Sequence, residues 1–67
     1  MYTEFKGKTC WLYSDYGQII RMLNVGGNVI QATASGDEQN GRVAVLDDRG
    51  FTTLFETTGR IIRCTKR

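Results

Sequence analysis

Residues 40–55 read Asn40-Gly41-Arg42-Val43-Ala44-Val45-Leu46-Asp47-Asp48-Arg49-Gly50-Phe51-Thr52-Thr53-Leu54-Phe55. Two runs rich in β-branched and aromatic residues flank the turn Asp47-Asp48-Arg49-Gly50, which is the composition of two short strands joined by a tight turn. Glycine takes a positive φ angle without a Cβ clash, so Gly50 suits the point where the chain reverses. The segment therefore predicts an antiparallel β-hairpin.

The same alternation of β-rich segments and glycine-centred turns continues in both directions along the chain. The other turns are Ser14-Asp15-Tyr16-Gly17, Val25-Gly26-Gly27-Asn28, Glu38-Gln39-Asn40-Gly41 and Thr57-Thr58-Gly59. The predicted strands are Thr9–Tyr13, Gln18–Asn24, Asn28–Ala34, Arg42–Asp47, Phe51–Glu56 and Arg60–Thr65. The chain has no proline, so none of these strands loses a ladder donor to one.

These features predict an all-β fold, a small antiparallel barrel of five or six strands built as a meander of hairpins. Residues 9–67 are expected to form the single barrel domain with a basic C-terminal tail. Residues 1–8 are expected to form an N-terminal arm or a short turn of helix. Trp11 is expected to anchor the core, since one large aromatic often organises a barrel this thin.

Several predicted strands carry apolar residues on both faces. Val43 and Val45 fall on one face of their strand, and Ala44 and Leu46 fall on the other. A domain of 67 residues has room for only one thin core. The excess of apolar surface therefore predicts a homo-oligomer or an obligate partner.

One ten-residue pattern occurs twice, 42 positions apart. The two copies are Leu12-Tyr13-Ser14-Asp15-Tyr16-Gly17-Gln18-Ile19-Ile20-Arg21 and Leu54-Phe55-Glu56-Thr57-Thr58-Gly59-Arg60-Ile61-Ile62-Arg63. Two copies do not make a repeat protein, which normally needs about three units. The echo predicts that Arg21 and Arg63 hold equivalent positions in two similar hairpins.

Charge is unevenly distributed, although the net charge is only +2. Residues 25–48 hold four Asp or Glu residues and one Arg, whereas residues 49–67 hold five Arg or Lys residues and one Glu. Two interpretations stay open for the last third: a solvated basic surface, or an edge that faces an anion.

The chain lacks the groups that most catalytic sites need. It has no histidine, so a hydrolytic triad or a Cys–His pair would have no imidazole base. The pairs Asp37-Glu38 and Asp47-Asp48 lie in turns, where carboxylates commonly bind local backbone amides. No phosphate-binding loop is present, and we expect no enzyme activity, no metal site and no cofactor.

Cys10 and Cys64 are the two cysteines, and they lie near opposite ends of the chain. They lack the paired spacing of a zinc site. Two interpretations stay open: two buried thiols in a reducing cytosol, or a disulfide between neighbouring terminal strands. The sequence shows neither a signal peptide nor a segment of the roughly 20 apolar residues that a membrane helix needs. We expect a cytoplasmic protein with no membrane partner.

The C-terminal strands resemble the last three strands of Sm-like and SH3-like small barrels. In those folds a short link leads into a final closing strand, as Glu56-Thr57-Thr58-Gly59 does here. The last Sm strand opens with a basic-Gly-x-x-aliphatic signature, which is similar to Thr58-Gly59-Arg60-Ile61-Ile62 with Thr58 in place of the basic residue. Asp37 and Asn40 resemble the Asp and Asn of the first Sm signature. In layout the chain resembles Rof-type Rho-inhibitor proteins and YgdI-type accessory proteins more closely than true Sm or Hfq chains. This resemblance implies a small barrel that acts by docking on another protein.

Two functions from different classes are consistent with these features, and a third is weaker. The first is a regulatory protein-binding module of the inhibitor or adaptor type, a kind frequent among phage and mobile-element accessory proteins. The second is an Sm-like protein that binds RNA or single-stranded DNA by stacking bases on aromatics beside a basic track. The third is an oligomer that traps a small anionic ligand or nucleotide between subunits. The candidate binding residues, for protein or nucleic acid, are Tyr13, Tyr16, Arg21, Arg49, Phe51, Arg60 and Arg63.

Overall fold

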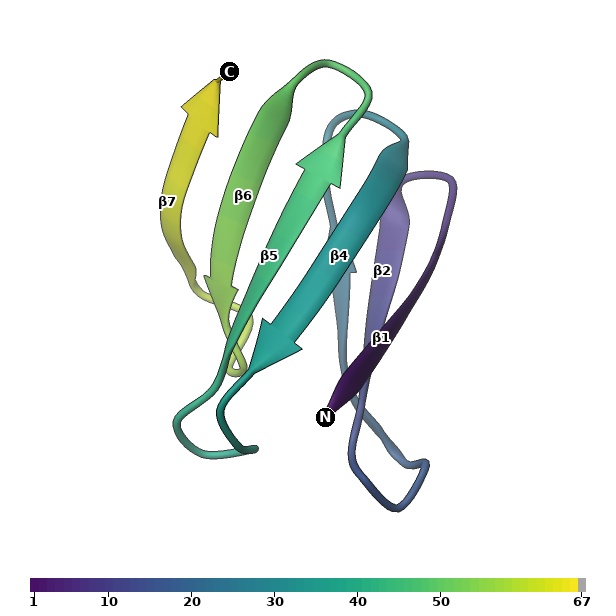
Figure 1. Ribbon diagram of the computed structural model, residues 1–67, viewed down its shortest axis with the longest axis vertical. Coiled ribbons are helices and arrows are strands. Elements are labelled where there is room, and N and C mark those ends of the chain that lie inside the picture. The colour runs from purple at the N-terminus through teal and green to yellow at the C-terminus, as the bar shows by residue number, and fades with distance from the viewer. Residues whose placement is uncertain (67) are drawn as a thin grey trace.

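The computed structural model describes residues 1–66, which fold into two antiparallel sheets (Figure 1). The strands are β1 (Tyr2–Lys6), β2 (Thr9–Tyr13), β3 (Ile19–Asn24), β4 (Val29–Ser35), β5 (Arg42–Asp47), β6 (Phe51–Glu56) and β7 (Ile61–Lys66). One sheet has the order β1-β2-β3, and the other has the order β4-β5-β6-β7. The molecule measures 32 × 22 × 14 Å, and its thin dimension accommodates two sheets packed about 10 Å apart.

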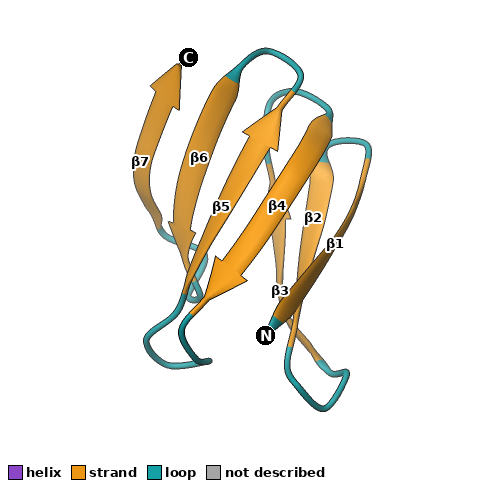
Figure 2. Ribbon diagram, in the orientation of Figure 1, coloured by secondary structure: helices purple, strands orange, loops and turns teal. Residues whose placement is uncertain are grey.

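The all-β prediction is confirmed, and so are the six predicted strands. Three of them have the predicted bounds, one begins one residue later, and two are displaced by one residue at both ends. Residues 1–66 consist of strands and turns (Figure 2), and they include no helix long and apolar enough to cross a membrane. Residues 2–6, expected in an arm or a helical turn, instead form β1, which pairs with β2 along its whole length. Arg67, counted above in the basic C-terminal segment, lies outside the described residues.

The predicted barrel of five or six strands is wrong, because the seven strands of residues 1–66 form two separate sheets. Consecutive strands pair with each other except at β3 and β4. Between them, residues 25–28 carry the chain from one layer to the other, where Val25 and Val29 donate backbone hydrogen bonds to Lys8 and Gly7. β1 lies beside β4, and the Thr3 hydroxyl donates to the Ala32 carbonyl at 3.2 Å, but the ladder does not continue across this junction. The sheet consequently never closes on itself.

The core lies between the two sheets and takes inward-facing residues from β2, β3, β4, β5 and β6. Its buried side chains are Cys10, Leu12, Leu23, Val29, Val43, Val45 and Phe55. Val43 and Val45 point inward and Ala44 and Leu46 point outward, as the alternation predicts. The predicted role of Trp11 is wrong. Trp11 lies between the two core residues Cys10 and Leu12, so it faces the opposite side of β2 and is only half-buried.

Three hairpin turns follow one plan, in which a glycine N–H donates to the carbonyl of the residue three positions earlier. These bonds run from Gly17 to Ser14 (3.0 Å), from Gly50 to Asp47 (3.1 Å) and from Gly59 to Glu56 (2.9 Å). The three glycines have φ angles of 83°, 87° and 94°, which explains why each turn ends in glycine. The turn residues therefore specify these reversals through local geometry alone.

The predicted equivalence of Arg21 and Arg63 is confirmed. Arg21 pairs with Leu12 across the β2–β3 hairpin, and Arg63 pairs with Leu54 across the β6–β7 hairpin. In both hairpins the register shifts immediately after that leucine. The two copies of the pattern thus form hairpins of the same register with a bulge at the same place.

Candidate docking surface

The outer face of the three-stranded sheet carries a group of apolar and aromatic side chains. We call it the aromatic face, and it consists of Tyr2, Trp11, Tyr13, Ile19 and Met22. Tyr2, Ile19 and Met22 are 45%, 61% and 55% exposed, and Trp11 and Tyr13 are half-buried. The rings of Tyr2 and Tyr13 stack with their centroids 5.0 Å apart and their planes 9° from parallel. All three strands therefore contribute to one apolar surface.

Strand register brings these side chains together. Tyr2 lies opposite Tyr13, and Tyr13 lies opposite Ile19 on the next strand. Trp11 lies opposite Met22, and residues directly opposite in an antiparallel pair project from the same face. Because the residues between them point into the core, the aromatic face is the side of the sheet turned away from the second sheet.

A single carboxylate lies within the aromatic face. Glu4 pairs with Trp11 across β1 and β2 and therefore shares its side of the sheet. Partial burial raises the pKa of the Tyr13 phenol, and the neighbouring Glu4 carboxylate raises it further by charge and by hydrogen bonding. Lys6 projects from the same side, opposite Thr9 at the far end of β1. The carboxylate beside Trp11 and Tyr13 favours a cationic group of a partner at that point and disfavours phosphate there.

The outer face of the four-stranded sheet has a different character. Two shallow hollows of about 200 and 220 Å³ adjoin there and share Ala44 and Thr52. Threonine and alanine side chains supply much of their lining, with Leu46 and Leu54 among them half-buried. The concentration of exposed aromatics is thus a property of the three-stranded sheet.

The predicted binding residues do not form one surface. Tyr13 belongs to the aromatic face, and Tyr16, 91% exposed, lies in the nearby β2–β3 turn. Arg21 projects from the other side of β3, where a Cβ added to Gly59 would lie 3.4 Å from its Cδ atom. Arg63 projects from the outer face of the four-stranded sheet, opposite Leu54. These positions separate Arg21 and Arg63 from the aromatic face.

Arg49 and Phe51, also predicted to bind a partner, are engaged within the β5–β6 turn. The Arg49 guanidinium donates to Asp47 Oδ2 at 2.9 and 3.3 Å and lies 4.7 Å from the centre of the Phe51 ring. Backbone N–H groups of Arg49 and Phe51 donate to Asp47 Oδ1. The Arg49 hydrogen bond, more than any other contact, holds the pKa of the buried Asp47 carboxyl below its usual value. These contacts organise the turn.

Arg60 follows the β6–β7 turn and is exposed. Its Nη1 atom lies 3.8 Å from Glu56 Oε1, which makes a weak and solvent-screened ion pair. Arg60 therefore keeps its charge available at the start of β7.

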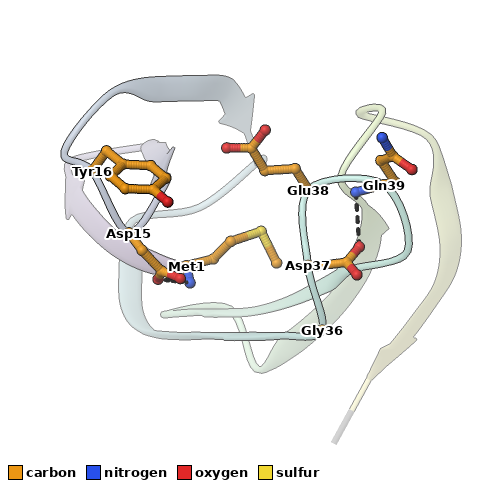
Figure 3. A pocket seen from close by; sticks show the side chains of 7 residues that line it. All are labelled: Met1, Asp15, Tyr16, Gly36, Asp37, Glu38 and Gln39. Carbon is orange, nitrogen blue, oxygen red and sulfur yellow. Dashed lines mark hydrogen bonds and ion pairs between the residues drawn. The ribbon is translucent and has the colours of Figure 1, made fainter.

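An acidic hollow of about 350 Å³ lies between the β2–β3 and β4–β5 loops (Figure 3). Its lining residues are Met1, Asp15, Tyr16, Gly36, Asp37, Glu38 and Gln39. Asp15 accepts from the Met1 amine at 2.6 Å, and Asp37 accepts from the backbone of Gln39 and Asn40. Asp15 and Asp37, two of the three carboxylates that line the hollow, thus already accept hydrogen bonds from N–H groups of the protein itself. Across residues 1–66, no three Asp, Glu or Cys side chains are grouped to hold a metal ion.

The two cysteines are free thiols and lie in different environments. Cys10 is buried in the core, and burial raises the pKa of its thiol. Cys64 is exposed on β7, with its Sγ atom 3.6 Å from the Thr53 hydroxyl. The structure therefore supports neither a disulfide nor a pair of buried thiols.

Most of the aromatic face was missed by the sequence-based prediction, which identified only Tyr13. Tyr2 was missed because residues 1–8 were not assigned to a strand. Ile19 and Met22 belong to the predicted strand Gln18–Asn24, in which strict alternation places them on opposite faces. The register shift at Tyr13 brings both to the same face. The available signal was the period-two pattern of Tyr2, Glu4 and Lys6, which continues the outward alternation of Trp11 and Tyr13.

Comparison with protein-family models, with curated proteins and with solved structures gives no match for this chain. The resemblance to Sm-like and Rof-type proteins accordingly stays a prediction.

Proposed function

We propose that this protein is a small non-enzymatic binding module that regulates another protein by docking on it through the aromatic face. One observation carries the proposal: a sheet that already buries one face against the core exposes tyrosine, isoleucine and methionine on the other. Docking on another protein is also the role expected of the Rof-type proteins that the C-terminal strands resemble.

The physical argument begins with what an antiparallel sheet normally exposes. When one face packs on a core, the other face is usually polar and solvated. Here Tyr2, Ile19 and Met22 are each close to or above half exposed around the half-buried Trp11 and Tyr13. Contiguous exposed apolar patches mark interaction surfaces, and tryptophan and tyrosine are the residues most enriched at binding hot spots.

Charge favours one kind of occupant. Glu4 lies among these side chains and would be desolvated when they are covered. A favourable complex therefore needs a basic side chain opposite Glu4. The partner that fits is a protein with an apolar surface that includes an Arg or Lys residue.

The same charge disfavours direct binding of RNA or single-stranded DNA. Stacking platforms for bases lie beside a basic track that follows the phosphates. The carboxylate of Glu4 would repel those phosphates, and Arg49 is already bound to Asp47. Arg21, the arginine nearest in the sequence to the aromatic face, projects from the other side of β3 and does not provide such a track either.

Site-specific photo-crosslinking tests the proposal. A benzophenone amino acid replaces Met22 in one variant and Thr52, on the outer face of the other sheet, in a matched control. Both are expressed in the cells that naturally make the protein. We expect a discrete protein adduct from position 22 that position 52 does not give.

A second substitution separates docking from incidental proximity. Ile19→Glu in the position-22 variant is expected to abolish the adduct, because it places a carboxylate inside the desolvated contact. Circular dichroism would establish that the β-sheet signal is retained. A nucleic-acid adduct at position 22, an equal adduct at position 52, or an adduct that survives Ile19→Glu would contradict the proposal.

A further inference from the structure

β7 is the least covered strand of the molecule. All six of its residues are exposed, and within residues 1–66 it forms an outer edge of the four-stranded sheet (Figure 1). Edge strands present unpaired N–H and C=O groups, which natural proteins usually protect with proline, charge or a covering segment. β7 has no proline, and its exposed Ile61 and Ile62 add apolar surface to the free edge.

On the side of the four-stranded sheet that faces the core, the side chains of β7 are exposed to solvent. Ile61 lies opposite Phe55, and Cys64 lies opposite Thr53. Phe55 and Thr53 are 3% and 6% exposed, whereas Ile61 is 57% exposed. The three-stranded sheet thus covers the inner side of β6 but does not cover the inner side of β7, although β7 carries residues suited to burial.

The charge along this edge has one sign. Arg63 and Lys66 belong to β7, and Arg60 immediately precedes it. The only acidic side chain paired with any of them is Glu56, 3.8 Å from Arg60, among the described residues. Long basic side chains that flank a free edge attract acidic residues on an incoming strand.

We propose that β7 receives an extended acidic segment of a partner protein, which adds to the four-stranded sheet as a fifth strand. A peptide supplies the backbone donors and acceptors that the free edge lacks, which a nucleic acid cannot do. A second copy of β7 would bring Arg60, Arg63 and Lys66 close to their own counterparts, and like charges on adjacent strands are unfavourable. Charge therefore selects a foreign acidic strand over self-pairing.

The segment should alternate in character. Residues on its inner side should be apolar, because they would cover Ile61 and Cys64. Residues on its outer side should be acidic, because they would lie beside Arg63. This edge is distinct from the aromatic face, so the outcome for one surface does not determine the outcome for the other.

A peptide of about seven residues that alternates Glu with Val is the probe, since natural strands are about this long. Titration into ¹⁵N-labelled protein is expected to shift the amide resonances of β7 and to slow their hydrogen exchange. A peptide with the same sequence and N-methyl groups on alternate amides is the matched control, because it retains the charge and lacks ladder donors. We expect it to bind at least about tenfold more weakly.

Charge reversal completes the test. Arg63→Glu, on the outer side of β7, is expected to weaken binding of the Glu-Val peptide about tenfold or more and to create binding of the corresponding Lys-Val peptide. Retained amide shifts outside β7 would show that the variant is folded. Four results would overturn the proposal: no binding to the natural sequence, equal binding of the N-methylated peptide, unchanged binding after charge reversal, or a β7-mediated homodimer that excludes the peptide.

Discussion

The β2–β3 and β6–β7 hairpins share one sequence pattern and one backbone plan, but they bury opposite faces. In the first, Leu12 is fully buried and the neighbouring Tyr13 faces outward. In the second, Leu54 faces outward and the neighbouring Phe55 is 3% exposed. The register and the bulge are the same in both hairpins. Local sequence thus specifies a hairpin, and the layer packed against it decides which face becomes core.

The final strands of the two hairpins differ in the same way. β3 buries Leu23, which lies opposite Cys10 in the core. β7 buries none of its residues, because the first sheet does not extend over it. Each proposed docking surface is the uncovered part of one hairpin: the outer face that includes β2 and β3, and the free edge at β7.

The largest expected difference between the hairpins concerns the two leucines. Leu12→Ala removes a fully buried side chain and should lower the free energy of unfolding by about 2–5 kcal/mol. Leu54→Ala removes a half-buried side chain and should lower it by about 1 kcal/mol or less. Urea denaturation measures both values, with Leu12→Val as a milder variant if Leu12→Ala does not fold. Equal losses would contradict the inversion of faces.

The aromatic residues that follow these two leucines should show the opposite order of stability effects, because Phe55 is buried and Tyr13 faces outward. Phe55→Tyr places a hydroxyl into the core and is expected to cost about 1–3 kcal/mol if that group has no partner. Tyr13→Phe removes a hydroxyl from an outward-facing ring and should change stability by about 0.5 kcal/mol or less. Thermal unfolding of both variants checks this prediction. A stable Phe55→Tyr protein beside a destabilised Tyr13→Phe protein would reverse the assignment.

The turn glycines should behave alike, because they belong to the shared local plan. Gly17→Ala and Gly59→Ala each force a residue with a Cβ atom into a positive φ angle, of 83° and 94°. Each is expected to destabilise the protein by about 1–2 kcal/mol. An added Cβ has no contact closer than 3.4 Å at either site, so strain and not collision produces the loss. Losses that differed widely would show that tertiary contacts enter the turn.

A third turn sharpens the comparison through its response to pH. Ser14 Oγ and Asp47 Oδ1 both accept from the N–H groups two and four residues later, but only Asp47 carries a charge. The pKa of Asp47 is below its usual value of 3.8, so its ionised form stabilises the folded state above that value, and this stability is lost as pH falls through the lowered pKa.

Asp47→Ser tests this directly, since it copies the uncharged acceptor of the β2–β3 turn. The variant should have a lower Tm than the natural sequence at neutral pH, and its Tm should fall less when the pH is taken below 3.8. Thermal unfolding monitored across this range is the measurement. Parallel pH profiles for the two proteins would show that Asp47 does not contribute to the acid sensitivity.

Sequence reasoning recovered the strands and much less of the candidate site. Period-two alternation and turn glycines are local signals, and they located six strands and the equivalence of Arg21 with Arg63. Trp11 was assigned to the core because of its size, but its neighbours Cys10 and Leu12 occupy the inward positions. A size rule cannot distinguish the two faces of a strand whose residues are apolar on both.

The sequence alone was sufficient to establish where the chain reverses and which segments pair. Its signals are positive-φ glycines, short hydrogen-bonding turn residues and β-branched runs, and their conformational preferences depend on only a few neighbouring residues. Three-dimensional packing was needed to establish that the strands form two open layers, that Tyr13 faces outward while Phe55 faces inward, and that β7 lies uncovered. These properties depend on contacts between residues far apart in the chain. When both faces of a strand are apolar, the sequence is compatible with burial of either face. The position of the opposing sheet then decides which face is buried.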